Sequence, residues 1–484
     1  MKAAAATAAG LAGCHGPSHT AARPKPNLVF VFADQWRAQA TGYAGDPNVL
    51  TPNLDRLAAE SVNLSTAVSC CPVCSPFRAS LMTGRYPLTH GVFLNDLRLN
   101  TQAVSFAEAL RRDGYSTAYV GKWHLDGTGR DAFTPPERRQ GFEYWKALEC
   151  THNYQQSAYY HGDSPSKLIW PGYDATAQTQ DAIEYLNAHG KDARPFALFL
   201  SWGPPHNPYR TGPKEWLDYY DRREPSFRDN VPAQTRDKAR SDIAGYYAHI
   251  TALDECLGRI ADALHSNGLD RNTILVFTSD HGDMLHSQGM MVKQKPWDES
   301  IRVPFLLRCP GDWGIAPRTI DAPINAPDFM PTILGLCGTP IPETVDGMDY
   351  SRVVVGRDRP RRDSAFIACY SPFGEWTRAR GGREYRGVRT SRYTYVRTLD
   401  GPWLLYDNEA DPYQMRNLCG APEAKGLQRR LEEELRDWLA RTGDDFASGP
   451  QLIRRCGYRV DENDTIGYTD PKSWGQVSVP ARVS

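Results

Sequence analysis

The segment at residues 69–87 places a thiol, a proline and an arginine in the order C-x-P-x-R, as Cys74, Pro76 and Arg78 in SCCPVCSPFRASLMTGRYP. Proline fixes its own φ near the helical value and keeps the preceding residue out of the α region, so we expect a helix with Ser75 as N-cap and Pro76 as first residue. The unpaired N–H groups at that helix end, together with the Arg78 guanidinium, would stabilise an anion. The pattern therefore predicts an anion-stabilising centre at Cys74.

Other interpretations of these thiols exist. Cys71 and Cys74 form a C-x-x-C pair, which occurs in redox dithiols and in zinc sites, and a lone cysteine can also fill core volume. No second C-x-x-C is present, which excludes a four-thiolate zinc ribbon, and no thioredoxin-sized βαβ unit surrounds this pair. Neither the redox nor the structural interpretation accounts for Pro76 and Arg78.

Four apolar runs of strand length each end in residues that can do chemistry, and such runs are typical of parallel strands covered on both faces. The runs lie at residues 27–33, 116–120, 195–201 and 273–279, and are followed in that order by Asp34, by Lys122 with His124, by His206, and by Asp280 with His281. In open parallel α/β sheets the site lies at the carboxyl ends of the strands. Each side chain alone could be a solvated charge or a satisfied histidine, but together they predict one site at this sheet edge.

The motif around Cys74 resembles the signature of the type I sulfatases of the alkaline phosphatase superfamily, in which this cysteine is oxidised to formylglycine. The resemblance rests on residues 74–78 (CSPFR) and 81–85 (LMTGR), and on YDNEADP at 406–412 with Asn417 and Leu418, which resembles the C-terminal domain of these enzymes. It implies a sulfuric ester hydrolase matured by a separate formylglycine-generating enzyme. A hydrated aldehyde carries two hydroxyls, so one can attack sulfur and the other can later expel sulfate, an exit that Ser or Cys lacks.

The same resemblance implies a metal site. Its ligands would be Asp34, Gln35, Asp280, His281 and an oxygen of the formylglycine formed from Cys74. Mostly oxygen donors favour Ca²⁺ before Mg²⁺, and one imidazole leaves Mn²⁺ and Zn²⁺ open. Many members have Asp in place of Gln35 and Asn in place of His281. The Gln and His combination resembles some bacterial carbohydrate sulfatases and also phosphonate monoester hydrolases.

Four cationic side chains would surround the sulfate and the ester oxygen, according to the resemblance. They are Lys122, His124, His206 and Lys293. Lys293 is chosen from KQKPWD at residues 293–298, where Lys295 is a competitor. Such cations offset negative charge on the bridging oxygen as the S–O bond breaks. Asp280 would help deprotonate the hydrated aldehyde, and His206 or Lys293 would protonate the leaving alcohol. His124 would take the second hydroxyl's proton during sulfate release.

The substrate is expected to be a sulfated carbohydrate. SWGPPH at residues 201–206 is similar to bacterial glycan sulfatases, which implies a 6-O-sulfated hexosamine. An insertion at about 130–173 interrupts the βα rhythm, and its rings form either a sugar-stacking wall or packing against the scaffold. These residues are Trp145, His152, Tyr154, Tyr159, Tyr160, His161 and Trp170. Two alternatives remain: a phosphonate monoester or phosphodiester hydrolase, and a non-catalytic sulfoglycan-binding protein if Cys74 is not converted.

The fold expected from these patterns is α/β, a large and mostly parallel sheet flanked by helices, with a smaller C-terminal α+β domain that contains an antiparallel sheet. We divide the chain into a leader and linker at 1–24, a catalytic domain at 25–358, a C-terminal domain at 359–447 and a tail at 448–484. The tail shows no apolar periodicity, so no element is predicted there.

Composition excludes several partners. The 484 residues carry a formal net charge of −1, so no global basic field points to nucleic acid, and no apolar run is long enough to span a bilayer. Lys2 precedes an alanine-rich run ending in LAGC at Cys14, which resembles a bacterial lipobox and implies export, to the periplasm or as a membrane-anchored lipoprotein. A plain secretory signal and a misassigned start codon are the alternatives. Of the 11 cysteines, Cys14 is assigned to acylation and Cys74 to conversion into formylglycine. The cysteines that remain are odd in number, and the sequence does not specify how they would pair in disulfides.

Overall fold

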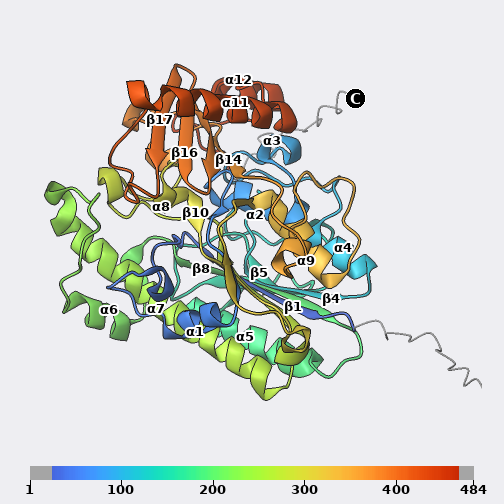
Figure 1. The fold of residues 1–484 in the computed structure, drawn as a ribbon. Coiled ribbons are helices and arrows are strands. Elements are labelled where there is room, and N and C mark those ends of the chain that lie inside the picture. The colour runs from blue at the N-terminus through green and yellow to red at the C-terminus, as the bar shows by residue number, and fades with distance from the viewer. Residues whose placement is uncertain (1–23, 468–484) are drawn as a thin grey trace, which may run out of the picture.

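The structure is a computed structural model that describes residues 24–467 (Figure 1). The leader with Cys14 lies outside the described residues, as does the end of the tail. No helix between residues 24 and 467 combines the length and the apolar character that crossing a membrane requires.

Ten strands of the described chain form one sheet whose centre is parallel (Figure 1). β1 lies between β8 and β9 and is parallel to both, and β4 and β5 continue the parallel part beyond β8. The order is β12 (Arg318–Ile320), β2 (Val62–Leu64), β11 (Phe305–Arg308), β9 (Thr273–Ser279), β1 (Asn27–Asp34), β8 (Phe196–Pro205), β4 (Ser116–Lys122), β5 (Tyr144–Leu148), β6 (Ala158–His161) and β7 (Leu168–Ile169). The predicted mostly parallel sheet is confirmed, with antiparallel β11, β6 and β7 added toward its edges.

Both faces of this sheet are covered, which explains why its central strands are apolar throughout. In β1, Val29 and Val31 enter one core and Phe30 and Phe32 enter the other. Figure 1 shows the two helical layers on opposite sides of the sheet. The first contains α1 (Pro52–Ala59), α5 (Asp174–His189) and α7 (Arg236–Ser266); the second contains α2 (Cys74–Thr83), α4 (Phe106–Arg112) and α9 (Ala326–Cys337). The other α-helices of this domain are α3 (Pro87–His90), α6 (Lys214–Asp221), α8 (Asp298–Ile301) and α10 (Ser351–Val354).

The C-terminal domain has the predicted α+β character. Its antiparallel sheet follows sequence order, and α11 packs against it (Figure 1). The elements are β14 (Ser364–Cys369), β15 (Tyr385–Thr390), β16 (Tyr393–Thr398), β17 (Gly401–Asp407) and α11 (Lys425–Thr442). A small sheet is formed by β3 (Ala67–Val68), β10 (Arg302–Val303) and β13 (Ile324–Asn325), and its strand β13 contacts β14 of the C-terminal sheet. The Ala368 N–H donates to the Cys70 carbonyl at 2.8 Å, which connects β14 to the segment before Cys74.

The first part of the tail is ordered, although its sequence predicted no element. It forms α12 (Gly449–Cys456), which buries Leu452 and Ile453. A helix this short has too few apolar positions for its period to be recognised in the sequence. Beyond α12, Tyr458 and Ile466 are also buried in the large core.

The ten cysteines within residues 24–467 are all free thiols, and eight of them are buried. Cys71 is therefore not joined to Cys74 in the structure. These thiols act as small apolar groups in the core, except where they line the site.

Candidate active site

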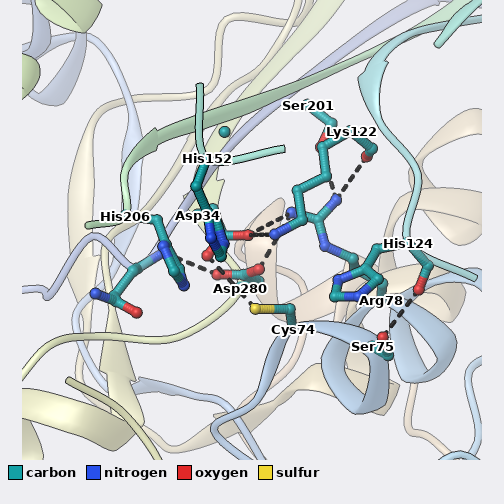
Figure 2. A network of polar contacts seen from close by, with 12 residues as sticks. Asp34, Cys74, Ser75, Arg78, Lys122, His124, His152, Ser201, His206 and Asp280 are labelled. Atoms are coloured by element: carbon teal, nitrogen blue, oxygen red, sulfur yellow. Dashed lines mark hydrogen bonds and ion pairs between the residues drawn. The ribbon is translucent and has the colours of Figure 1, made fainter. Parts of the chain in front are cut away.

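Cys74 is the first residue of α2, and Val73 is its N-cap. The prediction of Ser75 as N-cap and Pro76 as first residue is wrong, because Ser75 makes other contacts. The Ser75 N–H donates to Asn95 Oδ1 at 3.0 Å and its hydroxyl donates to the His124 carbonyl at 2.9 Å. Ser75 thus connects the start of α2 to two loops of the site, and position 74 faces the end of β1 (Figure 2).

Cys74 lies in a compact group of side chains that can bind a metal. Asp34 is the last residue of β1, and Asp280 and His281 come directly after β9. One ligand atom from each of these four residues lies within 4.8 Å of the others, and all four residues are buried. Cys74 Sγ is 3.3 Å from His281 Nε2 and 3.6 Å from Asp34 Oδ1. Two parallel strands and one helix end therefore converge as the strand-end pattern predicts.

Arg78 holds the two carboxylates of this group through its guanidinium (Figure 2). Its Nη2 lies 3.2 Å from one oxygen of Asp34 and 3.2 Å from one oxygen of Asp280. Its Nη1 donates to the Lys122 carbonyl at 2.7 Å and to Ser201 Oγ at 2.8 Å. The sequence predicted that Arg78 would act on an anion at position 74; in the structure, its hydrogen bonds fix the two carboxylates.

The charges of the group fit a bound divalent cation. Burial and the neighbouring Asp34 carboxylate raise the pKa of Asp280 to about 6, because two like charges share one guanidinium. A cation between them would remove that repulsion. His281 Nδ1 lies 2.9 Å from the Gly282 carbonyl, so its N–H donates there and leaves Nε2 for a metal. Two carboxylates and an oriented imidazole are suitable ligands for such an ion.

Gln35 lies beside this group. It has a left-handed φ of 69°, and its N–H donates to Asp280 Oδ1 at 3.0 Å. Its amide Nε2 donates to Asp283 Oδ2 at 2.8 Å, and its Oε1 accepts from Lys293 Nζ at 3.1 Å. The amide orientation is therefore fixed, with the oxygen toward the pocket cations. Metal ligation by Gln35 remains a prediction.

Lys122 is the last residue of β4 and His124 follows two residues later, and both side chains line the same cavity as Cys74. Lys122 Nζ donates to Asp34 Oδ2 at 2.5 Å. His124 has a left-handed φ of 59°, and its Nε2 bonds Asp96 Oδ1. Burial alone would lower the pKa of His124, but Cys150 and the Asp96 carboxylate raise it to about 10. His124 Nδ1 is buried and makes no hydrogen bond within the described residues.

His206 and Lys293 form a pair on the other side. Lys293 Nζ lies 2.6 Å from His206 Nε2, and His206 Nδ1 lies 2.7 Å from the Asn207 carbonyl. Burial and the Lys293 cation lower the pKa of His206, so the imidazole is neutral and accepts from the lysine. Burial disfavours the charged form of Lys293, but the negative charges of Cys74 and Glu375 raise its pKa. In this pair the lysine holds the proton.

The competitor Lys295 points elsewhere. Its Nζ donates to the Met291 carbonyl at 2.8 Å and lies over the Trp376 ring. Lys293, and not Lys295, lines the cavity beside Cys74. The placement therefore favours Lys293 among the two lysines.

A cavity of about 250 Å³ opens beside Cys74, and His152 and Arg130 of the insertion line it. The His152 ring stacks on His206 with centroids 4.7 Å apart. The other rings of the insertion do not form a wall of this cavity: Trp145, Tyr154, Tyr160 and Trp170 are buried and Tyr159 stacks on Trp170. Of the two interpretations of the insertion, packing against the scaffold is correct for these rings.

Several residues of the site were not predicted from the sequence. They are Asn95, Asp96, Cys150, Ser201, Asn207, Asp283, Glu375 and Thr465. Asp283 belongs to the DHGD run and Asn207 follows His206 directly, so both had a signal in the sequence. Asp96, Glu375 and Thr465 lie in loops with no motif.

The α/β sheet, the buried ligand group and the cations around it agree with the fold and site that the resemblance to alkaline phosphatase-type enzymes implies. Residues 26–339 match the sulfatase family, and residues 287–441 match the C-terminal domain of N-sulphoglucosamine sulphohydrolase. An ulvan-active sulfatase of Formosa agariphila is 45% identical over 91% of this chain and 86% of its own length. An endo-4-O-sulfatase of Bacteroides thetaiotaomicron is 33% identical over 92% of this chain and 98% of its own.

A solved structure agrees with these relatives. It comes from work on the metabolism of multiple glycosaminoglycans by Bacteroides thetaiotaomicron, with a TM-score of 0.79 and 32% identity. The match covers 89% of this chain and 99% of that one. The chain belongs to the sulfatase family and is a sulfuric ester hydrolase.

Proposed function

We propose that this enzyme removes sulfate from a sulfated carbohydrate, with formylglycine formed from Cys74 by a maturase and with a divalent cation. The observation that carries the proposal is the position of Cys74, which lies 3.3 Å from His281 Nε2 and lines a cavity together with Lys122, His124 and Lys293. The names of the ulvan-active and endo-4-O relatives support a carbohydrate substrate.

The cation would be held by Asp34, Asp280, His281 and Gln35 together with residue 74. Ca²⁺ is the proposed ion, with Mg²⁺ and Mn²⁺ as alternatives, and it would supply positive charge to the nucleophile and the sulfate. Hydrated formylglycine would supply two hydroxyls on one carbon, one for attack on sulfur and one for release of sulfate. Arg78 keeps both carboxylates in place for this arrangement.

The side chains around the cavity divide the remaining work. Lys122, fixed by Asp34, places positive charge where sulfate oxygens would lie. Lys293 holds a proton at Nζ, so we assign it as the acid that protonates the leaving alcohol, with His206 orienting it through the 2.6 Å contact. Because the raised pKa keeps His124 protonated, it would not take the second hydroxyl's proton; its unbonded Nδ1 would instead donate to negative charge that develops during sulfate release, while Asp96 holds the ring.

The position of the sulfate on the sugar is a finer proposal. The SWGPPH run favours O6 of a hexosamine, whereas one relative is named an endo-4-O-sulfatase. The test is to express the protein with a formylglycine-generating maturase and to screen it against monosulfated monosaccharides and disaccharides. Tryptic mass spectrometry should show a hydrazide-reactive carbonyl on the peptide with residue 74. Full activity with only the thiol there would contradict the mechanism.

The same screen decides between the other functions. Faster hydrolysis of aryl phosphonate esters than of any sulfate ester would favour the phosphonate monoester or phosphodiester hydrolase. Binding of sulfated glycans without turnover, with residue 74 still a thiol after expression with the maturase, would favour the non-catalytic protein.

Export is proposed on residues 1–14 alone. The LAGC sequence supports acylation of Cys14 after signal cleavage. Metabolic labelling with palmitate should mark the wild type and not Cys14→Ala. No labelling of either protein would leave the plain secretory signal and the misassigned start codon as the alternatives.

A further inference from the structure

The end of the described chain reaches the active-site cavity. After α12 the chain turns back through residues 458–467, and Thr465 lines the cavity together with Cys74. We call residues 458–467 the C-terminal hairpin, because Val460 and Ile466 pair as an antiparallel bridge. The two family matches end at residues 339 and 441, so this hairpin lies outside both.

The hairpin is anchored to the core at both ends. At its start, the Tyr458 hydroxyl donates to the Gly91 carbonyl at 2.9 Å and its ring lies 5.6 Å from that of Phe93. At its end, Ile466 is 2% exposed. Within it, the Asp461 carboxylate accepts from the Thr465 N–H at 2.9 Å. Thr465 is therefore held in one place relative to the cavity.

Hydrogen bonds also fix the hairpin to the loop that carries Lys293. Gln294, the next residue, donates to the Phe373 carbonyl at 3.0 Å and accepts from the Phe373 N–H at 3.2 Å. The Gly374 N–H then donates to the Asn463 carbonyl at 3.0 Å. Asp464 completes the connection by pairing with Arg378. Lys293 and Thr465 thus belong to one hydrogen-bonded assembly across two domains.

The part of the cavity lining that comes from the C-terminal part of the chain, which we call the wall, differs in charge from the part around Cys74, which we call the floor. The floor carries Lys122, His124 and Lys293, which suit a sulfate. The C-terminal domain contributes Phe373, Gly374 and Glu375 to the lining, and the C-terminal hairpin contributes Thr465. None of these four is a cation. The Glu375 carboxylate lies 3.9 Å from Lys293 Nζ, at the border with the floor, and would repel a second sulfate there. A carboxylate and a hydroxyl instead match the hydroxyl groups of a neutral sugar ring.

We infer that the C-terminal hairpin and Phe373–Glu375 form the wall that binds the sugar ring, so that Thr465 and Glu375 select the carbohydrate while the floor binds its sulfate. This inference rests on the proposed carbohydrate sulfatase function. The ligand class for the wall is an uncharged, hydroxyl-rich ring. A second sulfate on the side of the ring that meets Glu375 would be rejected.

The test compares a sugar substrate with one that lacks a sugar. The probes are 4-nitrophenyl sulfate, the 3-, 4- and 6-sulfates of N-acetylglucosamine, and the 2-, 3-, 4- and 6-sulfates of galactose. Thr465→Val removes one hydroxyl and should raise KM for the preferred sugar sulfate about fivefold. Thr465→Tyr fills the cavity and should raise it at least about tenfold. Thr465→Val should leave kcat/KM for 4-nitrophenyl sulfate within about twofold of the wild type, because the nitrophenyl ring has no hydroxyl for Thr465 to bind.

Glu462→Ala is the matched control, because Glu462 lies in the same hairpin, is exposed and does not line the cavity. Its kinetics should equal those of the wild type on all probes. Unchanged sugar-sulfate KM in Thr465→Tyr would overturn the inference, and so would equal losses of Thr465→Val on both kinds of substrate. Failure of the wild type to hydrolyse any of these sulfates would instead contradict the proposed function.

Discussion

Two regions of this enzyme bury carboxylates against arginines, and they do so differently. Where the C-terminal domain meets the catalytic domain, Arg389 contacts both oxygens of Asp298 at 2.9 Å and Arg302 contacts the same carboxylate at 3.2 Å. Within the C-terminal domain Arg386 pairs with both oxygens of Asp444. Each carboxylate there has at least one arginine of its own. In the active site Arg78 is shared between Asp34 and Asp280, at 3.2 Å from each.

The pKa values express the difference. Burial would raise the pKa of Asp298, but Arg389 and Arg302 lower it to about 2. The pKa of Asp280 is instead raised to about 6 by burial and by Asp34. A carboxylate with its own buried arginine stabilises the fold, whereas Asp280 shares its Arg78 with Asp34, which also pairs with Lys122, and so retains the capacity to bind another cation. The balance of charge therefore distinguishes the structural from the functional cluster.

The largest effect should follow from Asp280→Asn. Removing a ligand should abolish metal binding and lower kcat by at least about 10³-fold. The pKa of Asp280 is higher in the folded protein than in the unfolded chain, so ionised Asp280 destabilises the metal-free fold at pH 7. Without metal, the variant should therefore be more stable than the metal-free wild type at that pH. Metal analysis and chemical denaturation check both points. Unchanged metal content would remove Asp280 from the ligand set.

The next effect concerns the proton for the leaving group. Lys293→Ala should lower kcat on a sugar sulfate about 10²-fold and should affect 4-nitrophenyl sulfate far less, because nitrophenolate leaves without a proton. Lys295→Ala is the matched control, since its Nζ bonds the Met291 carbonyl outside the cavity. If His206→Ala showed the stronger dependence on the leaving group, the acid would be His206.

Asp298→Asn tests the structural cluster. The folded pKa is lowered from 3.8 to about 2, so the stabilisation is present above about pH 4 and is lost as pH falls through about 2. At pH 7 the variant should lose about 2 kcal/mol, roughly 30-fold in the folding equilibrium, at 1.36 kcal/mol per pKa unit. Activity of the folded fraction should not change. A fall in kcat without loss of stability would contradict the distinction between the two clusters.

The smallest effect is expected for Asp96→Asn. Its carboxylate raises the pKa of His124, so the substitution should lower that pKa from about 10 and reduce kcat about tenfold without changing KM. Histidine resonances followed by NMR against pH, with a pH–rate profile, check this. A higher KM with an unchanged profile would place Asp96 in substrate binding.

The strand-end residues could be predicted because one physical rule covers them. β1, β4, β8 and β9 are apolar on both faces, so the polar residue at each carboxyl end had to lie at the sheet edge. β15 was not predicted as a strand, because Arg386 and Arg389 interrupt its apolar pattern. They are buried by pairing with Asp444 and Asp298, which no local pattern reveals.

Loop residues of the site could not be predicted for a related reason. Asp96, Glu375 and Thr465 reach the cavity through tertiary contacts, and only the fold brings those segments together. The start of α2 shows the same limit at short range. Proline chemistry favours Ser75 as N-cap, but the contacts of Ser75 with Asn95 and His124 shift the helix start to Cys74.

The two hydrogen bonds between Gln294 and Phe373 have a thermodynamic consequence. A ligand that touches both Lys293 and Thr465 binds only when the two domains are docked, so its binding free energy adds to that of docking. At a concentration 100 times its Kd, such a ligand stabilises the docked arrangement by about 2.7 kcal/mol. Conversely, any substitution that loosens the docking weakens apparent affinity by the fraction of molecules left undocked. Substrate affinity and domain cohesion are in this sense linked quantities, each measurable through the other.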